Sequence, residues 1–268
     1  MKKRLSTELT NSEYHADPAI SKSGLDLIHK APAVYWDQKL NPRAEKQETA
    51  AMRLGSMIHM RVLERELFGS TYAHAPAVDR RTKAGKEAWQ SFIDANPGKE
   101  IMSDDEGILV EKIGRAVDKS EIASSLLKGA EIESSFFWEK DDLKMKCRAD
   151  AIRENGVVID LKTTTDASPR GFLRSVMNFR YHVQAAYYLD GISQFQPATS
   201  FVLIAVEKTP PYLVGVYMMP EQLIEHGRQE YKKDLHTFAR CLESDSWPGL
   251  PDSIQVLDVP GWIDGSGD

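Results

Sequence analysis

Asp150, Asp160 and Lys162 are the residues of this chain whose types and spacing best suit catalysis. Asp160 and Lys162 are two positions apart, so on a β-strand their side chains would share one face. Two carboxylates supply the hard oxygen ligands that Mg²⁺ or Mn²⁺ prefers, and an ammonium group beside them can stabilise developing negative charge. The set therefore points to metal-assisted hydrolysis.

The register of one hairpin decides whether the two aspartates meet. Residues 154–156, Glu-Asn-Gly, form a turn between two largely apolar runs. A three-residue loop that ends with Gly156 in the left-handed conformation pairs residue 153 with 157 and places Asp150 opposite Asp160. A two-residue loop would place Asp150 opposite Leu161 and mix apolar and charged side chains on both faces. We therefore predict the three-residue loop.

The predicted register gives each face of the hairpin a consistent character. One face is apolar and the other is charged: the first carries Ala149, Ala151, Ile159 and Leu161, and the second carries Arg148, Asp150, Asp160 and Lys162. Like charges that lie directly opposite each other destabilise a sheet, so the two acids need a compensating charge. A divalent cation is one solution. A salt-bridge ladder with Arg148 and Lys162 is the other, and the residues alone favour neither.

The hairpin belongs to a β-rich middle section that lies between helical regions. Alternating apolar residues and turn signals predict strands at 134–138, 144–153, 157–163, 200–207 and 212–217. Helical spacing predicts helices at 23–30, with Ser23 as the N-cap, and at 49–65, 87–93, 169–177, 183–192 and 221–242. We expect an α/β fold in one domain over residues 1–268. It would comprise a helical N-terminal part to about residue 130, a mixed sheet flanked by helices at about 131–242, and an acidic tail at 243–268.

Two of the predicted helices carry polar side chains one turn apart. Gly55 and His59 are separated by four residues, so the glycine leaves room beside the imidazole. Gln184 and Tyr188 have the same spacing. A lone helical histidine is usually structural, which is also the expectation for His182, and an amide and a phenol at this spacing also fit an ordinary amphipathic helix.

Charge and composition restrict the class of protein. The chain has 34 basic and 40 acidic residues, but residues 241–268 hold six acids and no Lys or Arg, so the remainder is neutral overall. A local basic patch for nucleic acid therefore stays possible, and the loop with Arg80, Arg81, Lys83 and Lys86 is one candidate, although such loops are usually solvated. Two cysteines exclude a disulfide-stapled scaffold and a four-cysteine metal site.

Targeting and membrane signals are weak in this sequence. No apolar run approaches the roughly 20 residues that span a bilayer. The N-terminal Met-Lys-Lys-Arg is not followed by the apolar segment of an export signal. We therefore expect a soluble cytoplasmic protein without a membrane partner.

An ordered set of motifs resembles the RecE (exonuclease VIII) family, in the RecB-like branch of the PD-(D/E)xK nuclease superfamily. The resemblance covers most of the chain. Ala149 stands where the superfamily name has proline, a position that supplies no ligand. The motifs are Ser21-Lys22-Ser23-Gly24-Leu25, Gly55-Ser56-Met57-Ile58-His59, Cys147-Arg148-Ala149-Asp150, Val158-Ile159-Asp160-Leu161-Lys162-Thr163-Thr164, Tyr181-His182-Val183-Gln184-Ala185-Ala186-Tyr187-Tyr188, and Cys241-Leu242-Glu243 with Trp247-Pro248.

The resemblance implies a restriction-endonuclease-like fold with a Mg²⁺ or Mn²⁺ site. Lys162 would orient or activate the attacking water. Glu133 would add a carboxylate, with Glu131 and Glu139 as competitors for that role. The remaining ligands would be His59, Asp150, Asp160 and the backbone carbonyl of Leu161.

Contacts with DNA are also implied by the resemblance. Gln184 and Tyr188 would lie beside the active site, where they hold the DNA backbone or the catalytic lysine. Arg148, Arg80 and Arg81 are further candidates, because guanidinium groups bind phosphates well.

The same family resemblance implies an exodeoxyribonuclease that degrades double-stranded DNA from 5′ to 3′ and releases 5′-phosphates. The remaining 3′ single strands would serve a RecT-like annealing partner in recombination, and a bacterial phage or prophage origin would fit. A net-neutral body attracts DNA only modestly. The resemblance implies a ring-shaped homo-oligomer, with a tetramer favoured, that would keep the enzyme on its substrate. The alternatives are a RecB-like nuclease of other polarity and a non-catalytic DNA-binding module; two cysteines cannot supply the iron–sulfur cluster of Cas4-like nucleases.

Overall fold

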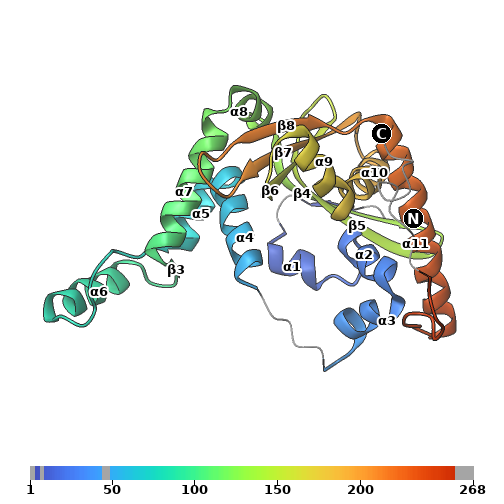
Figure 1. The fold of residues 1–268 in the computed structure, drawn as a ribbon, viewed down its shortest axis with the longest axis horizontal. Coiled ribbons are helices and arrows are strands. Elements are labelled where there is room, and N and C mark those ends of the chain that lie inside the picture. The colour runs from blue at the N-terminus through green and yellow to red at the C-terminus, as the bar shows by residue number, and fades with distance from the viewer. Residues whose placement is uncertain (1–3, 7–8, 44–48, 257–268) are drawn as a thin grey trace.

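A six-stranded sheet forms the centre of the molecule (Figure 1). The structure is a computed structural model that describes residues 4–6, 9–43 and 49–256. The strand order is β1-β4-β5-β6-β7-β8, in which β6 and β7 are parallel and the other neighbours are antiparallel. Helices flank this mixed sheet, which confirms the predicted fold class. The strands are β1 (Arg4–Ser6), β4 (Glu131–Lys140), β5 (Leu143–Ile152), β6 (Val157–Thr164), β7 (Ser200–Glu207) and β8 (Val214–Met218).

Helices cover both faces of the sheet, because successive residues of its central strands alternate between two apolar clusters. On β7, Leu203 packs into one cluster and Ile204 into the other. The first face is covered by α2 (Lys22–Lys30), α3 (Pro32–Tyr35), α9 (Pro169–Asn178), α10 (Tyr181–Ile192) and α11 (Glu221–Ser244). The second face is covered by α4 (Ala50–Leu63), α5 (Arg65–Thr71), α7 (Asp104–Lys119) and α8 (Glu121–Leu127).

The β5–β6 hairpin has the predicted register. Ala151 pairs with Ile159, and the Arg153 N–H donates to the Val157 carbonyl at 3.0 Å. Gly156 has a φ of 84°, a left-handed conformation that glycine adopts without strain and that closes the three-residue loop. The turn chemistry therefore fixes which residues of β5 and β6 lie near each other.

The predicted apolar face of this hairpin is wrong at one residue. Ala151, Ile159 and Leu161 pack together on the second face, but Ala149 packs into the cluster on the first face. The cause lies in the β4–β5 pairing, which skips the pair between Glu133 and Asp150. Glu133 has a φ of 53°, so the alternation of the pleat is interrupted there. This irregularity lies next to the candidate catalytic residues.

The N-terminal part is largely helical, as expected, with differences in detail. The first predicted helix is α2, but its N-cap is Ser21 rather than Ser23, because the Ser21 hydroxyl accepts from the Gly24 N–H. Pattern reading missed several short elements: β1, α3, α5, α8, α1 (Asn11–Ala16), the π-helical turn η1 (Trp36–Leu40), β2 (Tyr72–His74) and β3 (Glu100–Met102). It also missed the long helix α7.

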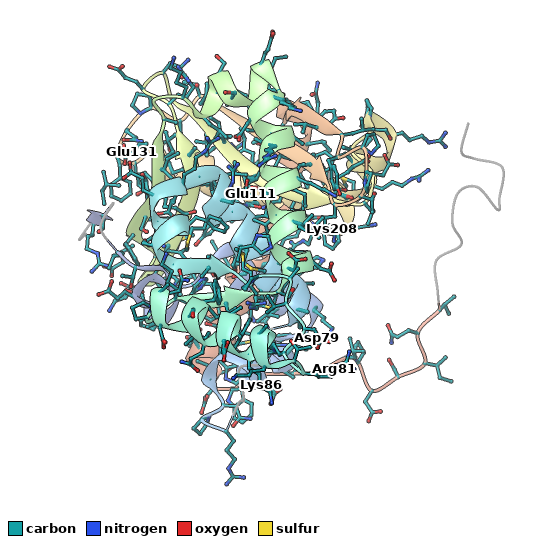
Figure 2. All side chains as sticks on the ribbon, turned by 90° about the vertical axis from the view of Figure 1, so that its left-hand side faces the viewer. Asp79, Arg81, Lys86, Glu111, Glu131 and Lys208 are labelled. Carbon is teal, nitrogen blue, oxygen red and sulfur yellow. The ribbon has the colours of Figure 1, made fainter. Side chains whose placement is uncertain are left out.

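Helix α6 (Lys83–Ala95) lies at the end of an arm that extends away from the sheet (Figure 1). The short parallel strands β2 and β3 form its base. Figure 2 shows Asp79, Arg81 and Lys86 together on this arm. The basic loop of the sequence is therefore remote from the β5–β6 hairpin in the ribbon.

The C-terminal segment begins where α11 ends at Ser244. Residues 257–268 of the predicted acidic tail lie outside the described residues. Within the described part of the chain, no helix has both the length and the apolar character that a membrane crossing requires.

Candidate active site

The β5–β6 hairpin opens into a fork beyond its last backbone pair, which joins Ala151 and Ile159. Side chains satisfy the backbone groups of Leu161 inside this fork. Its N–H donates to Asp150 Oδ2 at 2.7 Å, and its carbonyl accepts from His59 Nε2 at 2.8 Å. The carbonyl can only accept, so this contact places a proton on Nε2 of His59. The fork thus brings together residues from β5, β6 and α4.

Asp160 is held by two side chains inside the fork. Gln184 Nε2 donates to Oδ1 at 2.5 Å, and Lys162 Nζ lies 2.6 Å from Oδ2. The ammonium also lies 4.8 Å from the centre of the Tyr181 ring, a cation–π contact. The side chain of Asp160 is only 3% exposed and that of Lys162 is 19% exposed. The lysine is therefore oriented by an acid and a ring and still reaches solvent.

His59, Glu133 and Asp150 form a group that we call the fork cluster. Each residue offers one ligand atom, and these atoms all lie within 4.8 Å of one another. His59 Nδ1 is 3.6 Å from Asp150 Oδ2. The cluster lines a cleft of about 920 Å³ together with Gly55 and Tyr188. The left-handed backbone of Glu133 faces this cleft, and strain of this kind is concentrated at functional sites.

Burial and mutual repulsion disfavour the charged forms of the two acids in the fork cluster. Burial raises the pKa of Asp150, and the charge of Asp160 adds to the rise, although His59 and Lys162 oppose it. Burial also raises the pKa of Glu133, and the charge of Asp150 adds to that rise. Burial opposes the charge of Lys162, but Asp160 and Asp150 outweigh it and raise its pKa, so the ammonium stays charged.

The salt-bridge ladder that the sequence left open is only partly present. Lys162 does pair with Asp160, but Arg148 is 3.8 Å from Glu133 and is used elsewhere. Its guanidinium donates to Ser135 Oγ and to the backbone carbonyl of residue 9, each at 2.7 Å. Among the described residues, Asp150 therefore has no Lys or Arg ion-pair partner, and Glu133 has only the long contact with Arg148.

The ligand chemistry of the fork fits a hard divalent cation. Asp150, Glu133 and the Leu161 carbonyl are oxygen donors, and His59 adds an imidazole, which suits Mn²⁺ better than Mg²⁺. Asp160 is a neighbour of this set and is occupied by Lys162 and Gln184. Of the competing glutamates, Glu131 accepts from Ser134 Oγ at 2.5 Å.

The remaining predicted DNA-contact residues are placed differently. Tyr188 lines the cleft, and Arg148 also contributes to its wall although its side chain is mostly buried. Arg80 stacks over the Trp89 ring, with 4.4 Å from its guanidinium carbon to the ring centre, and Arg81 pairs with Asp79 at 3.1 Å. These two arginines belong to the arm and do not join the fork.

Sequence reasoning assigned no role to three residues near this site, although two of them, Lys22 and Tyr181, stand in the quoted motifs. Tyr181 stacks on the ammonium of Lys162, and Tyr14 of α1 lines the cleft. Lys22 donates to the Phe179 carbonyl at 2.8 Å, and its pKa is lowered first by burial and further by the charge of Lys162. A signal for α1 was present, because Thr10 and Glu13 have the spacing of a capping box and form one.

A mixed sheet whose forked hairpin presents Asp150 on one strand and Asp160-Leu161-Lys162 on the next defines a PD-(D/E)xK-like fold. The family model described as "PDDEXK-like domain of unknown function (DUF3799)" matches residues 21–260, and the chain belongs to this family. The predicted superfamily is thereby supported, whereas the RecE family in particular stays a prediction.

Solved structures that are similar to this chain include two that are named as exonucleases. A protein from Eubacterium rectale, named provisionally as an exonuclease, is 15% identical with a TM-score of 0.67 over 97% of this chain and 99% of that chain, so the two share a fold. An alkaline exonuclease from Laribacter hongkongensis is 9% identical with a TM-score of 0.36 over 88% of this chain and 96% of that chain, a likeness too low to carry an argument. No curated protein matches the sequence.

Proposed function

We propose that the chain is a divalent-metal-dependent exonuclease that degrades double-stranded DNA from 5′ to 3′ and leaves 3′ single-stranded tails. The observation that carries this proposal is the fork, where the fork cluster adjoins the Lys162–Asp160 pair. Membership of a PDDEXK-like family supports a nuclease. The direction of digestion and the preference for duplex DNA come from the resemblance to the RecE family.

The side chains of the fork have separate roles in the proposed reaction. Asp150, Glu133, His59 and the Leu161 carbonyl hold the cation, with Asp160 beside them. When bound, Mg²⁺ or Mn²⁺ supplies Lewis acidity toward a phosphodiester oxygen. Lys162 places its positive charge next to the phosphorus that water attacks, and Gln184 keeps Asp160 in position. Water adds to phosphorus, the P–O3′ bond breaks, and the products carry a 5′-phosphate and a 3′-hydroxyl.

Substitutions in the fork test whether it is catalytic. Asp160→Asn preserves the shape of the side chain, and Lys162→Met preserves most of its length, so both variants should fold. We expect each to lose digestion of linear duplex DNA in Mg²⁺. Asp142→Asn, in the exposed β4–β5 turn, and Lys144→Met, on the exposed surface of β5, are the matched controls and should digest normally. Wild-type rates in folded Asp160→Asn or Lys162→Met would refute the proposed function.

The direction of digestion needs its own experiment. Duplexes with a label at the 5′ end or at the 3′ end of one strand distinguish the two polarities. We expect early release of the 5′ label and retention of the 3′ label on a strand that becomes shorter. Release of the 3′ label first would assign the opposite polarity, and binding of duplex without any release would indicate a non-catalytic module.

The proposed function also has consequences for the oligomeric state of the protein and for its protein partner. The part of the chain before residue 241 has no net charge, so processive digestion needs a means of staying on DNA other than general attraction. We propose a ring-shaped homo-oligomer, with a tetramer favoured, that encloses the duplex, and a RecT-like annealing protein that receives the single strand. Light scattering at micromolar concentration tests the assembly, and a monomeric mass would contradict it.

A further inference from the structure

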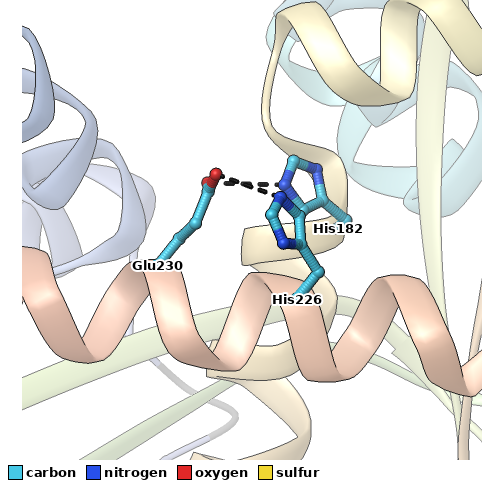
Figure 3. A group of neighbouring side chains, drawn as sticks. All are labelled: His182, His226 and Glu230. Atoms are coloured by element: carbon cyan, nitrogen blue, oxygen red, sulfur yellow. Dashed lines mark ion pairs between the residues drawn. The ribbon is translucent and has the colours of Figure 1, made fainter.

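Helices α10 and α11 bring together His182, His226 and Glu230, which we call the helix cluster (Figure 3). His182 Nε2 is 3.4 Å and His226 Nε2 is 3.3 Å from the Glu230 carboxylate. One ligand atom from each residue lies within 4.8 Å of the other two. His226 and Glu230 are one turn apart on α11, so both point to the same side of that helix. The two imidazole rings stack at an angle of 13°.

Gly227 allows the two helices to approach closely enough to form the helix cluster. A Cβ atom at this position would lie 2.8 Å from the backbone nitrogen of Val183 and would overlap the carbonyl group of His182. The backbone of α11 therefore packs directly against the first turn of α10. The relative position of His182 and His226 is fixed by this backbone contact and not by flexible side chains alone.

The hydrogen bonding of His182 leaves one ring nitrogen available. Nδ1 is 3.4 Å from the Val176 carbonyl, which can only accept, so Nδ1 carries the proton in that contact. Nε2 is buried, makes no hydrogen bond and faces an oxygen of Glu230, which is also an acceptor. Metal-binding histidines typically donate from one nitrogen to a carbonyl and use the other as the ligand.

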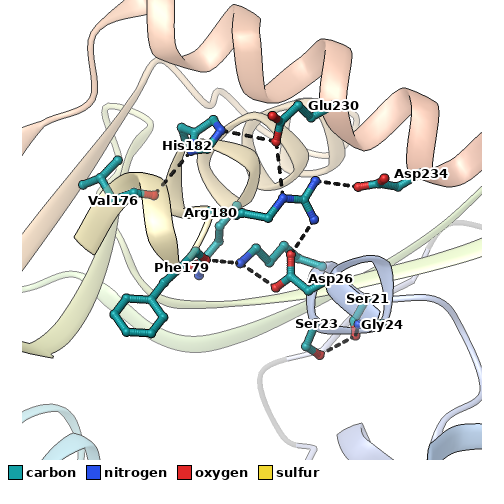
Figure 4. A network of polar contacts seen from close by, with 12 residues as sticks. Ser21, Ser23, Gly24, Asp26, Val176, Phe179, Arg180, His182, Glu230 and Asp234 are labelled. Carbon is teal, nitrogen blue, oxygen red and sulfur yellow. Dashed lines mark hydrogen bonds and ion pairs between the residues drawn. The ribbon is translucent and has the colours of Figure 1, made fainter. Parts of the chain in front are cut away.

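The charges that face the helix cluster leave room for a cation. The guanidinium of Arg180 is 3.3 Å from Glu230, but it also pairs with Asp26 at 2.8 Å and with Asp234 at 2.5 Å (Figure 4). Lys22 also pairs with Asp26 at 2.7 Å, so two cations face three carboxylates and one negative charge remains in excess. His226 borders a surface hollow of about 400 Å³, so the site is accessible from solvent.

We propose that His182, His226 and Glu230 bind one borderline divalent transition-metal ion, with Zn²⁺ preferred, and that the ion fastens α10 to α11. Two imidazole nitrogens and one carboxylate are characteristic ligands of Zn²⁺ and of Co²⁺, whereas Mg²⁺ prefers an all-oxygen set. The ion also holds the first turn of α10, from which Gln184 reaches Asp160. This site is separate from the fork cluster and does not depend on the proposed nuclease activity.

Cobalt provides a visible probe for the helix cluster in the full-length chain. After treatment with EDTA and dialysis, we expect Co²⁺ to bind with visible absorption bands and Zn²⁺ to displace them. His226→Ala, which removes an exposed ligand and keeps a good helix former, should remove the Co²⁺ bands of this site. His236→Ala, an exposed histidine on the same helix, is the matched control and should bind as wild type.

The fork cluster also contains a histidine, so the experiment must distinguish the two sites. We expect Asp150→Asn to keep the Co²⁺ bands that His226→Ala removes. Zn²⁺ should raise the melting temperature of wild type, His236→Ala and Asp150→Asn, but not that of His226→Ala. The proposal is overturned if His226→Ala binds Co²⁺ as tightly as wild type, or if the bands disappear in Asp150→Asn and persist in His226→Ala.

Discussion

Histidine and carboxylate side chains make up both the fork cluster and the helix cluster, but the pKa values of the carboxylates are shifted in opposite directions. In the fork, burial and repulsion raise the pKa values of Asp150 and Glu133. In the helix cluster, burial also opposes the charge of Glu230, but the charge and hydrogen bond of Arg180 are the main opposing contributions, and its pKa is lowered. The comparison teaches that a surplus of buried negative charge, rather than the presence of histidine, distinguishes a site for a hard catalytic cation.

The largest expected effect is on the rate of digestion and comes from Lys162, the basic residue beside the fork cluster. Lys162→Met should reduce single-turnover digestion by roughly a thousandfold, because the ammonium is positioned to stabilise charge in the transition state. It should not weaken Mn²⁺ binding, because it removes a positive charge from the fork. Digestion rates at saturating Mn²⁺, with a parallel binding titration, test this. A loss of metal affinity equal to the loss of rate would contradict the assigned role.

Arg180 is expected to act on stability and not on chemistry. Its mostly buried guanidinium pairs with Asp26, Glu230 and Asp234, so Arg180→Met would leave three carboxylates without their shared partner. We expect the free energy of unfolding to fall by about 3 kcal/mol. Urea unfolding measures this, with Arg174→Met on the exposed face of α9 as the control. A change below about 1 kcal/mol, the size of an exposed pair, would contradict the account.

Neutralising one acid in each cluster should change stability in opposite directions when no metal is present. Asp150→Asn keeps an acceptor for the Leu161 N–H and removes a disfavoured charge, so unfolding should require about 1 kcal/mol more. Glu230→Gln removes a favoured charge and should lower the free energy of unfolding by a similar amount, about 1 kcal/mol. Urea unfolding in EDTA tests both variants, and changes of equal sign would contradict the comparison.

The pH dependence of these two effects follows from the same pKa directions. The pKa of Asp150 is raised on folding, so the folded state binds the proton more tightly and wild type loses stability relative to Asp150→Asn as pH rises above about 4. The pKa of Glu230 is lowered on folding, so its contribution is present above the unfolded pKa, about 4.3, and is lost as pH falls through the lower folded value. Unfolding series between about pH 3.5 and 7 should show the two trends.

A further expected effect concerns the choice of metal ion. His59 contributes the one nitrogen ligand of the fork cluster, and nitrogen favours Mn²⁺ over Mg²⁺. His59→Ala should therefore reduce the preference for Mn²⁺ by about tenfold, measured as the ratio of metal concentrations that give half-maximal digestion. Equal losses with both ions would indicate that His59 acts through its bond to Leu161 instead.

The central hairpin could be predicted from local chemistry, because the Glu-Asn-Gly turn admits one register that separates apolar from charged residues. The strand from Ser200 to Glu207 could likewise be predicted, since its residues 201–206 are all apolar and buried. The interruption of the β4–β5 pairing at Glu133 could not be predicted, because a left-handed residue inside a strand has no sequence signature when it is not glycine.

Contacts between segments that are distant in the chain could not be predicted from the sequence either. His182 was expected to be structural, and nothing in its neighbours indicates that His226 and Glu230 pack against it. Their proximity depends on the close backbone contact at Gly227, which arises only when α10 and α11 are packed. The stacking of Tyr181 on Lys162 is a long-range contact of the same kind. Helix α7 was missed despite its capping box at Ser103 and Glu106.

An anomalous diffraction map of a crystal soaked in Mn²⁺ tests the central claim most directly. We predict a strong peak between the carboxylates of Asp150 and Glu133 and the Leu161 carbonyl, at about 2.0–2.3 Å from its oxygen ligands. The same peak should vanish in Asp150→Asn. A map without a peak at the fork, in which Lys162 remains the only cation beside the acids, would contradict the account.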